Sequence, residues 1–548
     1  MVDFYKKNKE KTIAFLAVAL AIAVAVISVS AFGIKYQSND DATLANIAAG
    51  AYGSDTLHMV YVNVLFSLML RPLYAMYAAN WYVFVQLLLV TVSIAITAYI
   101  LMKKMGLLCG GMITVAMLAA FAEPIYYTFQ YTECGFIILT GGILLLADNL
   151  GELNKKTALG IAMALMGSLI RWDIFYAVGG LSSVLLVYKF FNLDINGKKK
   201  AVVTMVILFI VTFSAKAVDV LAYKMDPRWD EFARYNEART AYSDYKFYQV
   251  MDKENPFQSY GISDSEYIML SNWNYYDEEV FTIELLEEIS KGNQQITVTD
   301  LLVQTFEQVK DMMHGNSYRN MFFLIAMLSI ISLRRKWSSI SMIAMYGIFG
   351  ILMLYLMYRM RFVSWVEMGL IWTVSVFALY HIAETEIRKP LTISVTVILA
   401  ITLCLCIPMY VQLYFVDSPV YAEWSKQEES YFEAMVRDKD NLYLLTTQSI
   451  SNVAGYDVMN PRSEGFFSNI VEYGGWLSRA PHRDSVLAEY GLRRPLVDAV
   501  DNPRVFLDYH YINEAVEYVS GQLGKEIYAV STGDNPYAPY QLVSQLSK

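Results

Sequence analysis

Charged residues are scarce in this sequence. Only 17% of its 548 residues are Asp, Glu, Lys or Arg, whereas soluble proteins average about a quarter. The chain is 56% hydrophobic, and its mean hydropathy is positive. An excess of basic residues is also missing, because the net charge is −9, and this argues against nucleic acid as a partner. The composition therefore predicts an integral membrane protein.

Cysteine and histidine are also few. The four cysteines lie inside apolar runs or at their edges, so we interpret them as small hydrophobic residues. Their spacing suits neither a disulfide framework nor a metal site. The five histidines are scattered and form no HExxH pattern. These absences exclude the disulfide-rich and zinc-protease classes. The cysteines are Cys109, Cys134, Cys404 and Cys406.

Long apolar runs, by contrast, are abundant. A membrane-crossing helix needs about 20 apolar residues to span about 30 Å of hydrocarbon. Residues 57–78 are apolar but interrupted by Arg71-Pro72, so we expect a partly embedded or interfacial helix there. The first run follows basic residues, as in a signal peptide, but its length favours an uncleaved span. We predict about eleven spans, at 12–34, 81–102, 106–122, 131–148, 157–170, 174–191, 201–221, 319–333, 338–358, 362–382 and 390–415.

Basic residues in the connections between spans predict the orientation, because they favour the cytoplasmic side. If the N-terminus is cytoplasmic, every inner connection is basic. The basic groups are Lys103-Lys104, Lys155-Lys156, Lys189 with Lys198-Lys199-Lys200, Arg334-Arg335-Lys336 and Arg388-Lys389. The segment 222–318 and the tail from 416 are then extracytoplasmic.

The chain thus divides into a transmembrane domain, 1–415, and an extracytoplasmic domain, 416–548. The transmembrane domain includes the outer loops 35–80 and 222–318, and we expect the longer loop to be helical. The tail alternates strands and helices, which predicts a small α/β domain. Its expected strands are 442–447, 504–509 and 527–532, with helices near 423–437 and 512–523. It contains no nucleotide fingerprint or nucleophile motif, so we expect it to bind the acceptor or to be structural.

Two adjacent carboxylates, Asp40 and Asp41, stand where the first span leaves the membrane on the outer side. One interpretation is a helix cap, in which Asn39 or Asp40 accepts hydrogen bonds from a helix that begins near Ala42. The second interpretation is a general base at the mouth of a membrane cavity. A neighbouring carboxylate couples the two ionisations and helps to tune one of them for proton transfer. The sequence leaves both interpretations open.

Arginines on the outer side go against the orientation bias. Arg171 follows the fifth span, and Arg359 and Arg361 follow the ninth. A guanidinium binds phosphate through two parallel hydrogen bonds and keeps its charge, so arginines at headgroup depth suit a lipid-linked phosphate. A structural role is equally consistent with their position, because charges at a span end also snorkel to the interface. Arg171 also suits an ion pair with Asp173 or Asp41.

The second outer loop, 123–133, combines acids and tyrosines. Tyr126, Tyr127 and Tyr131 suit an aromatic belt at the membrane surface. Aromatic rings also stack on sugar faces, and Glu133 offers a further acid beside them. This loop therefore supplies Tyr131 and Glu133 as candidate substrate contacts.

The first outer loop carries a resemblance to a known family. A basic N-terminus, a first span and the Asp40-Asp41 pair precede the segment NIAAGAYGSDTLHMVYVNVLFSLMLRPLYAMYAANWYV. Together they resemble the GT-C glycosyltransferase superfamily, and within it the multi-pass membrane proteins of Gram-positive bacteria. The segment YNEARTAYSDY at 235–245 is similar to one that recurs in the long outer loop of those proteins. The resemblance covers residues 1–415 in layout and is specific in the first outer loop.

The resemblance implies a sugar transferase that works outside the cytoplasmic membrane with a polyprenyl-phosphate sugar as donor. The acceptor is expected to be a cell-envelope glycan, a teichoic acid or a lipid. The acid of the first loop matches Asp40 or Asp41, and we prefer Asp40 as the base. Arg359 or Arg361 matches the basic residues that bind phosphate, with Arg171 as a further candidate.

The resemblance also suggests two secondary roles. His58 falls where related proteins often carry a polar residue, which makes it a candidate substrate contact, although an interfacial histidine explains it equally well. Some members bind a divalent metal, Mg²⁺ or Mn²⁺, for which Asp40, Asp41 and Glu133 are the candidate ligands here.

Such an enzyme inverts the anomeric carbon in one displacement. A transporter or flippase of lipid-linked saccharides is the main competing interpretation, and it predicts charges in mid-span or broken helices. Lys216, Asp219 and Glu367 lie nearest to that description. A non-enzymatic protein of cell-envelope assembly, or an envelope polymerase or ligase, is also consistent with the sequence.

Overall fold

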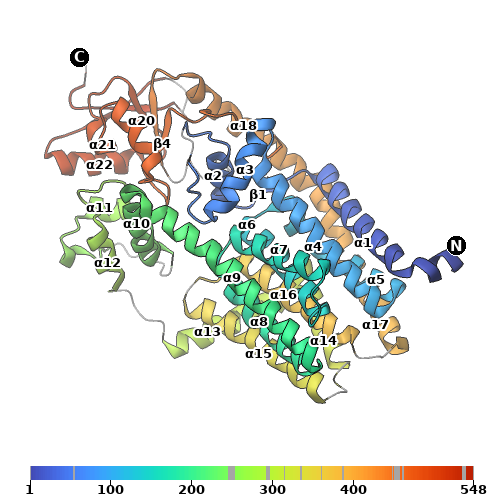
Figure 1. Cartoon of the computed structure of the whole chain (residues 1–548). Coiled ribbons are helices and arrows are strands. Elements are labelled where there is room, and N and C mark those ends of the chain that lie inside the picture. Colours follow the sequence, from blue (N-terminus) through green and yellow to red (C-terminus); the bar gives the residue numbers. More distant parts are fainter. Residues whose placement is uncertain are drawn as a thin grey trace.

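The computed structural model is mainly helical (Figure 1). The structure describes residues 2–53, 56–244, 254–291, 297–313, 315–331, 333, 336–359, 361–384, 388–446, 449, 457–459, 462–533 and 538–546. Side chains are described for these residues except 2–7, 331, 336–337, 388–390 and 428.

Helices are found at all eleven predicted spans. Within the described residues, nine of them are long and apolar enough to cross a membrane. These are α1 (Val2–Phe32), α4 (Trp81–Met105), α5 (Leu107–Ala122), α6 (Tyr131–Asp148), α8 (Asp173–Phe191), α9 (Ile195–Met225), α15 (Lys336–Tyr358), α16 (Ser364–Ala383) and α17 (Arg388–Gln412). The remaining two, α7 (Lys155–Ile170) and α14 (Ser317–Ile331), have 16 and 15 residues. The predicted polytopic helical fold is confirmed.

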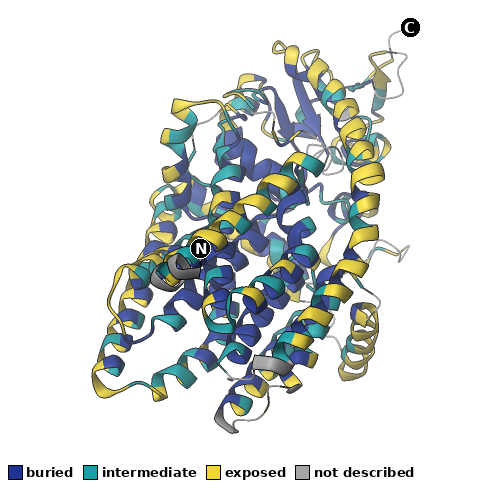
Figure 2. Cartoon of the chain, turned by 90° about the vertical axis from the view of Figure 1, so that its right-hand side faces the viewer, coloured by how far each residue is buried: buried dark blue, intermediate teal, exposed yellow. Residues whose placement is uncertain are grey.

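Helix α6 lies at the centre of the helical region. It packs against α4, α7, α8 and α16, and 94% of its residues are buried. Helices α6 and α7 meet at glycines, where a Cβ atom on Gly142 would lie 2.6 Å from the backbone nitrogen of Ala164. Small residues let helices in a membrane pack closely. Exposed residues lie mainly on the outward surfaces of the long helices (Figure 2), which is where lipid is expected.

The two predicted outer loops of the membrane region are also helical. The first contains α2 (Asn39–Ala48) and α3 (Val64–Met76), and α3 coincides with the predicted interfacial segment. The second, which follows α9, contains α10 (Pro227–Ser243), α11 (Asp264–Ser271), α12 (Ile283–Lys291) and α13 (Val298–Met313). A π-helical turn, η1 (Glu123–Tyr127), follows α5. Strand β1 (Lys35–Tyr36) pairs in parallel with β2 (Thr128–Phe129), and this joins the first outer loop to residues 123–133.

The C-terminal part is carried by a long helical segment. Helix α17 continues through η3 (Leu413–Asp417) into α18 (Ser418–Arg437). At about 1.5 Å per residue this segment is roughly 75 Å long, so it extends well beyond about 30 Å of hydrocarbon. The predicted division at 415/416 falls inside η3.

A small five-stranded sheet follows α18, as predicted. Its order is β4-β3-β5-β7-β6, with β3, β4 and β5 parallel and with β7 antiparallel to both of its neighbours. The sequence predicted β3, β5 and β6 but neither β4 nor β7. The elements are β3 (Leu442–Leu445), β4 (Ile470–Glu472), α20 (Asp484–Glu489), α21 (Pro495–Asp498), β5 (Val505–Leu507), α22 (Ile512–Leu523), β6 (Tyr528–Ser531) and β7 (Tyr540–Val543).

Direct contacts place the predicted outer segments on one face of the molecule. The backbone N–H of Gly465 donates to the carbonyl of Gly50 at 2.9 Å, and that of Gly475 donates to the carbonyl of Trp273 at 2.8 Å. The C-terminal part accordingly lies beside α2 and α10 in Figure 1.

The predicted inner connections gather at the opposite ends of the spans, where ion pairs join them. They include Lys103–Asp148 at 3.0 Å, Lys189–Glu384 at 2.8 Å and Lys156–Glu10 at 2.6 Å. Arg334 and Arg335 lie outside the described residues, as do the side chains of Lys336, Arg388 and Lys389.

Candidate functional site

Asp41 holds two outer segments together. Its carboxylate accepts hydrogen bonds from the backbone N–H of Tyr131 at 2.9 Å and from the hydroxyl of Ser38 at 2.8 Å. The side chain is fully buried, and this burial raises its pKa to about 8. Helix α2 begins at Asn39 with Ser38 as the N-cap residue, so neither Asn39 nor Asp40 is the cap. Asp41 therefore has a structural role, because it connects α2 to the start of α6.

Asp40 points in a different direction and remains partly accessible. Its Oδ1 accepts a hydrogen bond from the indole Nε1–H of Trp476 at 2.7 Å, which links α2 to the loop after β4. Burial raises the pKa of Asp40, whereas the Trp476 bond and the charges of Arg239 and Arg171 lower it. A carboxylate with a raised pKa is better matched to proton transfer near neutral pH. Of the two adjacent acids, Asp40 has the geometry of a candidate base.

Arg171 is the C-cap residue of α7, and its charge acts on Asp40. It donates to the hydroxyl of Tyr131 at 2.8 Å and pairs with Asp173 at 3.2 Å. Its guanidinium carbon lies 5.2 Å from the ring centre of Tyr61. The Arg171 side chain is 18% exposed, whereas Asp173 is 74% exposed, so solvent weakens this pair. The charge of Arg171 also acts on Asp40, whose pKa it lowers.

A second group of charged side chains belongs to the same site as Asp40. These side chains come from α10 and from the segment before α16. Arg239 donates to the hydroxyl of Tyr61 at 3.2 Å and pairs with Asp244 at 3.0 Å. Asp244 also pairs with Arg361 at 3.1 Å. The charges of Asp244 and Arg239 act on the pKa of Asp40. The ring of Tyr61 in turn lies 5.0 Å from that of Trp476, the partner of Asp40.

We call this assembly the Asp40 cluster. It contains three guanidinium groups and two carboxylates, and Asp173 adds a third, exposed carboxylate beside Arg171. Guanidinium groups bind phosphate through charge-assisted hydrogen bonds. The cluster joins the predicted Asp40, Tyr131, Arg171 and Arg361 to four residues that the sequence did not single out. The segment at 235–245, which carries part of the family resemblance, supplies two of these four. The cluster consists of Asp40, Tyr61, Tyr131, Arg171, Arg239, Asp244, Arg361 and Trp476.

Three predicted residues have different surroundings. His58 stacks on Trp229 with ring centres 4.3 Å apart, and its Nε2 lies 3.3 Å from the carbonyl of Ala222, so it ties the first outer loop to the end of α9. Glu133 lies in the first turn of α6 and is 2% exposed. Arg359 follows α15, where its backbone N–H donates to the carbonyl of Tyr355 at 2.9 Å. The contacts that define the Asp40 cluster include none of these three.

The proposed metal ligands are also separated. In the part of the chain that the structure describes, no group of three or more His, Cys, Asp or Glu side chains is placed to hold an ion. Both oxygens of Asp41 already accept hydrogen bonds. Asp40, Asp41 and Glu133 therefore do not form a ligand set.

The charged side chains that the transporter interpretation depends on form ion pairs within the structure. Lys216 and Asp219 lie 2.8 Å apart, and Asp219 also accepts from the backbone N–H of Val64 at the start of α3. Glu367 forms two hydrogen bonds with Arg319, at 2.8 and 2.7 Å. Glu367 belongs to the first turn of α16, so it lies at a span end and not in mid-span. The Arg319–Glu367 pair joins α14 to α16, and the Asp219 bond to Val64 joins α9 to α3, whereas Lys216 and Asp219 both belong to α9.

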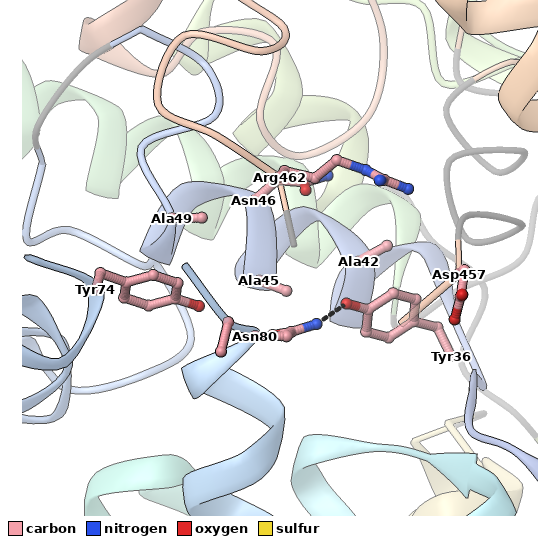
Figure 3. A pocket seen from close by; sticks show the side chains of 10 residues that line it. Tyr36, Ala42, Ala45, Asn46, Ala49, Tyr74, Asn80, Asp457 and Arg462 are labelled. Atoms are coloured by element: carbon pink, nitrogen blue, oxygen red, sulfur yellow. Dashed lines mark hydrogen bonds between the residues drawn. The ribbon is translucent and has the colours of Figure 1, made fainter. Parts of the chain in front are cut away.

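A hollow of about 340 Å³, part of it open to solvent, adjoins α2. Figure 3 shows Ala42, Ala45 and Ala49 along the side of α2 that faces it. Opposite them, Asn80 donates to the hydroxyl of Tyr36 at 2.7 Å and to the carbonyl of Val458 at 3.1 Å. The hollow thus lies between the first outer loop, the start of α4 and the C-terminal part.

No family model matches the chain, and no curated protein matches its sequence. Among solved structures, the chain is similar to crystal structures of ArnT from Cupriavidus metallidurans, one bound to undecaprenyl phosphate and one in the apo state. The alignments cover 96% of this chain and 97% of that chain at 11% sequence identity, with TM-scores of 0.35 and 0.39 respectively.

Proposed function

We propose that this protein is an inverting glycosyltransferase that acts at the outer surface of the cytoplasmic membrane. It takes a sugar from a polyprenyl-phosphate donor and transfers it to a cell-envelope acceptor. The observation that carries the proposal is the Asp40 cluster, in which a candidate base and arginines meet where membrane helices adjoin the C-terminal part. The resemblance of the first outer loop to GT-C enzymes supports the same reaction.

The reaction follows from the roles of these groups. The acceptor hydroxyl gives its proton to the Asp40 carboxylate, and its oxygen attacks the anomeric carbon of the donor sugar. The bond between that carbon and the phosphate oxygen breaks, and the polyprenyl phosphate leaves with the electron pair. One displacement inverts the configuration at the anomeric carbon.

Arg171 stabilises the leaving phosphate. It ends α7, one of the predicted spans, and a guanidinium at the end of a span suits a phosphate at headgroup depth. Electrostatic stabilisation of charge that develops in the transition state is commonly the largest contribution to catalysis. Arg361, held by Asp244, supplies a second positive charge on the side of α10.

Mass spectrometry of cell-envelope glycans from cells with and without this protein tests the proposal. We expect one sugar modification to disappear when the protein is absent. The Asp40→Asn variant keeps the size of the side chain but removes the proton acceptor, so transfer falls by about 10²- to 10⁴-fold. The Ser531→Ala variant, on an exposed strand end of the same chain, serves as the control.

Two experimental results would contradict the proposed transferase function. Unchanged glycans in the absence of the protein would exclude the transferase. A flippase predicts that the unmodified lipid-linked saccharide accumulates on the inner side, and that Asp40→Asn leaves transfer intact when the donor is supplied from outside.

A further inference from the structure

The C-terminal sheet has a strand order with a topological switch point. Its first strand, β3, lies between β4 and β5, and all three strands are parallel. From β3 the chain goes first to β4, on one side of β3, and then crosses to β5, on the other side. The two connections therefore diverge between β3 and β5. In open parallel sheets, ligands bind outside the carboxyl ends of the strands at this switch point.

Polar side chains converge at this point. Thr446 follows β3 and Asp508 follows β5, and both are buried. The ring Nδ1 of His510 lies 3.1 Å from Oδ2 of Asp508 and 3.1 Å from the hydroxyl of Ser449. The hydroxyls of Ser449 and Thr446 lie 3.0 Å apart. Tyr431 from α18 donates to Asp508 at 3.1 Å.

The hydroxyl of Tyr473 also belongs to this group. Tyr473 follows β4 and is 1% exposed, and among the described residues no hydrogen-bond partner is found for its oxygen. The charges of Asp508 and Glu514 act on this hydroxyl and raise its pKa, together with burial. A buried hydroxyl without a partner destabilises the folded protein. This cost is offset if a ligand supplies the missing hydrogen bond.

The arrangement differs from that of a hydrolase. In a Ser-His-Asp triad the serine and the aspartate contact opposite nitrogens of the histidine ring. Here Ser449 and Asp508 both face Nδ1 of His510, so the ring is not placed to activate the serine. The group therefore suits binding and not nucleophilic attack.

The crevice lies close to the Asp40 cluster. Tyr473 and Trp476 are three residues apart on the loop after β4, so their Cα atoms are separated by at most about 10 Å. Trp476 contacts Asp40 directly. A ligand of a few sugar rings in the crevice is therefore able to present a hydroxyl to Asp40.

Hydroxyl groups, an imidazole and tyrosine rings favour a polyhydroxylated ligand. Tyr431, Tyr509 and Tyr511 are partly exposed around the cluster, and aromatic rings stack on the apolar faces of sugars. Tyr511 begins α22 in the left-handed region, with φ of 54°. Residues other than glycine are uncommon there and often mark functional sites.

We propose that this crevice, at the carboxyl ends of β3, β4 and β5, binds the saccharide portion of the acceptor and presents its hydroxyl to Asp40. The identification of the ligand as the acceptor rests on the proposed transferase function. Asp508 orients His510, while His510 and Tyr473 hydrogen-bond the sugar.

Steady-state kinetics of the full-length protein in detergent tests this site. We compare His510→Ala and Tyr473→Phe with Ser531→Ala, and we measure both transfer to the acceptor and transfer to water. Loss of one hydrogen bond should raise the KM for the acceptor by about 3- to 10-fold in Tyr473→Phe. The kcat and the hydrolysis of the donor should not change, because the Asp40 cluster is intact. Tyr473→Phe should fold normally, because its hydroxyl has no partner in the described structure.

An unchanged KM for the acceptor in both variants overturns the proposal, as does an equal fall in transfer and donor hydrolysis. A binding experiment separates this site from the transferase function. The full-length protein is applied to an array of defined oligosaccharides. Binding that is retained in Asp40→Asn and Ser531→Ala but lost in His510→Ala supports the crevice even if no transfer is detected. Failure of the wild-type protein to bind any oligosaccharide on the array overturns it.

Discussion

Asp40 and Asp41 are adjacent in the chain but make contacts with different parts of the molecule. Consecutive helical residues point about 100° apart, so Asp41 faces the start of α6 while Asp40 faces Trp476 of the C-terminal part. The two side chains are chemically identical, so only their positions give one a structural role and the other a reactive role. The sequence identified the pair, but only the position of α2 distinguishes its members.

At the scale of single residues, Arg171 gives a testable prediction. Arg171→Lys keeps the positive charge but removes the planar fork that binds phosphate through two hydrogen bonds. We expect the Kd for a polyprenyl phosphate, the leaving group of the proposed reaction, to rise by about 10- to 100-fold, because a charge-assisted hydrogen bond contributes about 1.5–3 kcal/mol. Native mass spectrometry of the purified protein measures this binding.

Arg228→Lys is the matched control, since it changes an exposed arginine of α10 that lies outside the Asp40 cluster and pairs with Asp226. Equal weakening by the two substitutions would contradict a specific role for Arg171. A fall in thermal stability that accounts for the lost binding would assign Arg171 to the structure, through its bonds to Tyr131 and Asp173.

At the scale of elements, the junction of α2 with α6 depends on a buried acid. The pKa of Asp41 is about 8 in the folded protein, raised by burial from its usual 3.8. Between these two values the folded state holds more protons than the unfolded state, so stability falls as pH rises through this window. Asp41→Asn removes the titration and keeps an oxygen that accepts the N–H of Tyr131.

We therefore expect the Tm of the wild-type protein to fall more steeply than that of Asp41→Asn between about pH 5 and about pH 8. Scanning fluorimetry in detergent measures both curves. Parallel curves would show that the junction does not titrate. Sugar transfer by Asp41→Asn should stay near the wild-type level, in contrast to Asp40→Asn.

The elements differ in how far the sequence predicts them. Hydropathy is a local property, so the helices at all eleven spans and the strands β3, β5 and β6 were predicted from short windows. The two-residue strands β1 and β2 were not, because their pairing joins Tyr36 to Phe129 across the chain. Trp476 lies 436 residues from Asp40, and no local pattern links them. The helices were thus predictable, whereas the tertiary contacts that complete the site were not.

At the scale of the whole molecule, the predicted outer segments contact one another directly. Asp277, between α11 and α12, accepts hydrogen bonds from Arg494 at 2.6 Å and from Tyr518 at 2.7 Å. Arg479 donates to the carbonyl of Phe281 at 2.7 Å. The long outer loop and the C-terminal sheet therefore support each other, and together they cover the Asp40 cluster.

The last prediction concerns the orientation of this structure in the membrane. Ser259 and Ser531 are exposed on the face of the predicted outer segments, while Asn196 is exposed in the first turn of α9, just before the basic residues 198–200. In a variant whose four native cysteines are replaced, single cysteines at Ser259 and Ser531 should react with a membrane-impermeant maleimide in intact cells. A cysteine at Asn196 should react only after the cells are opened, because the positive connections favour the cytoplasm. Labelling of Asn196→Cys in intact cells, with protection of the two outer positions, would reverse the orientation and would place the Asp40 cluster where nucleotide sugars, and not lipid-linked sugars, are the available donors.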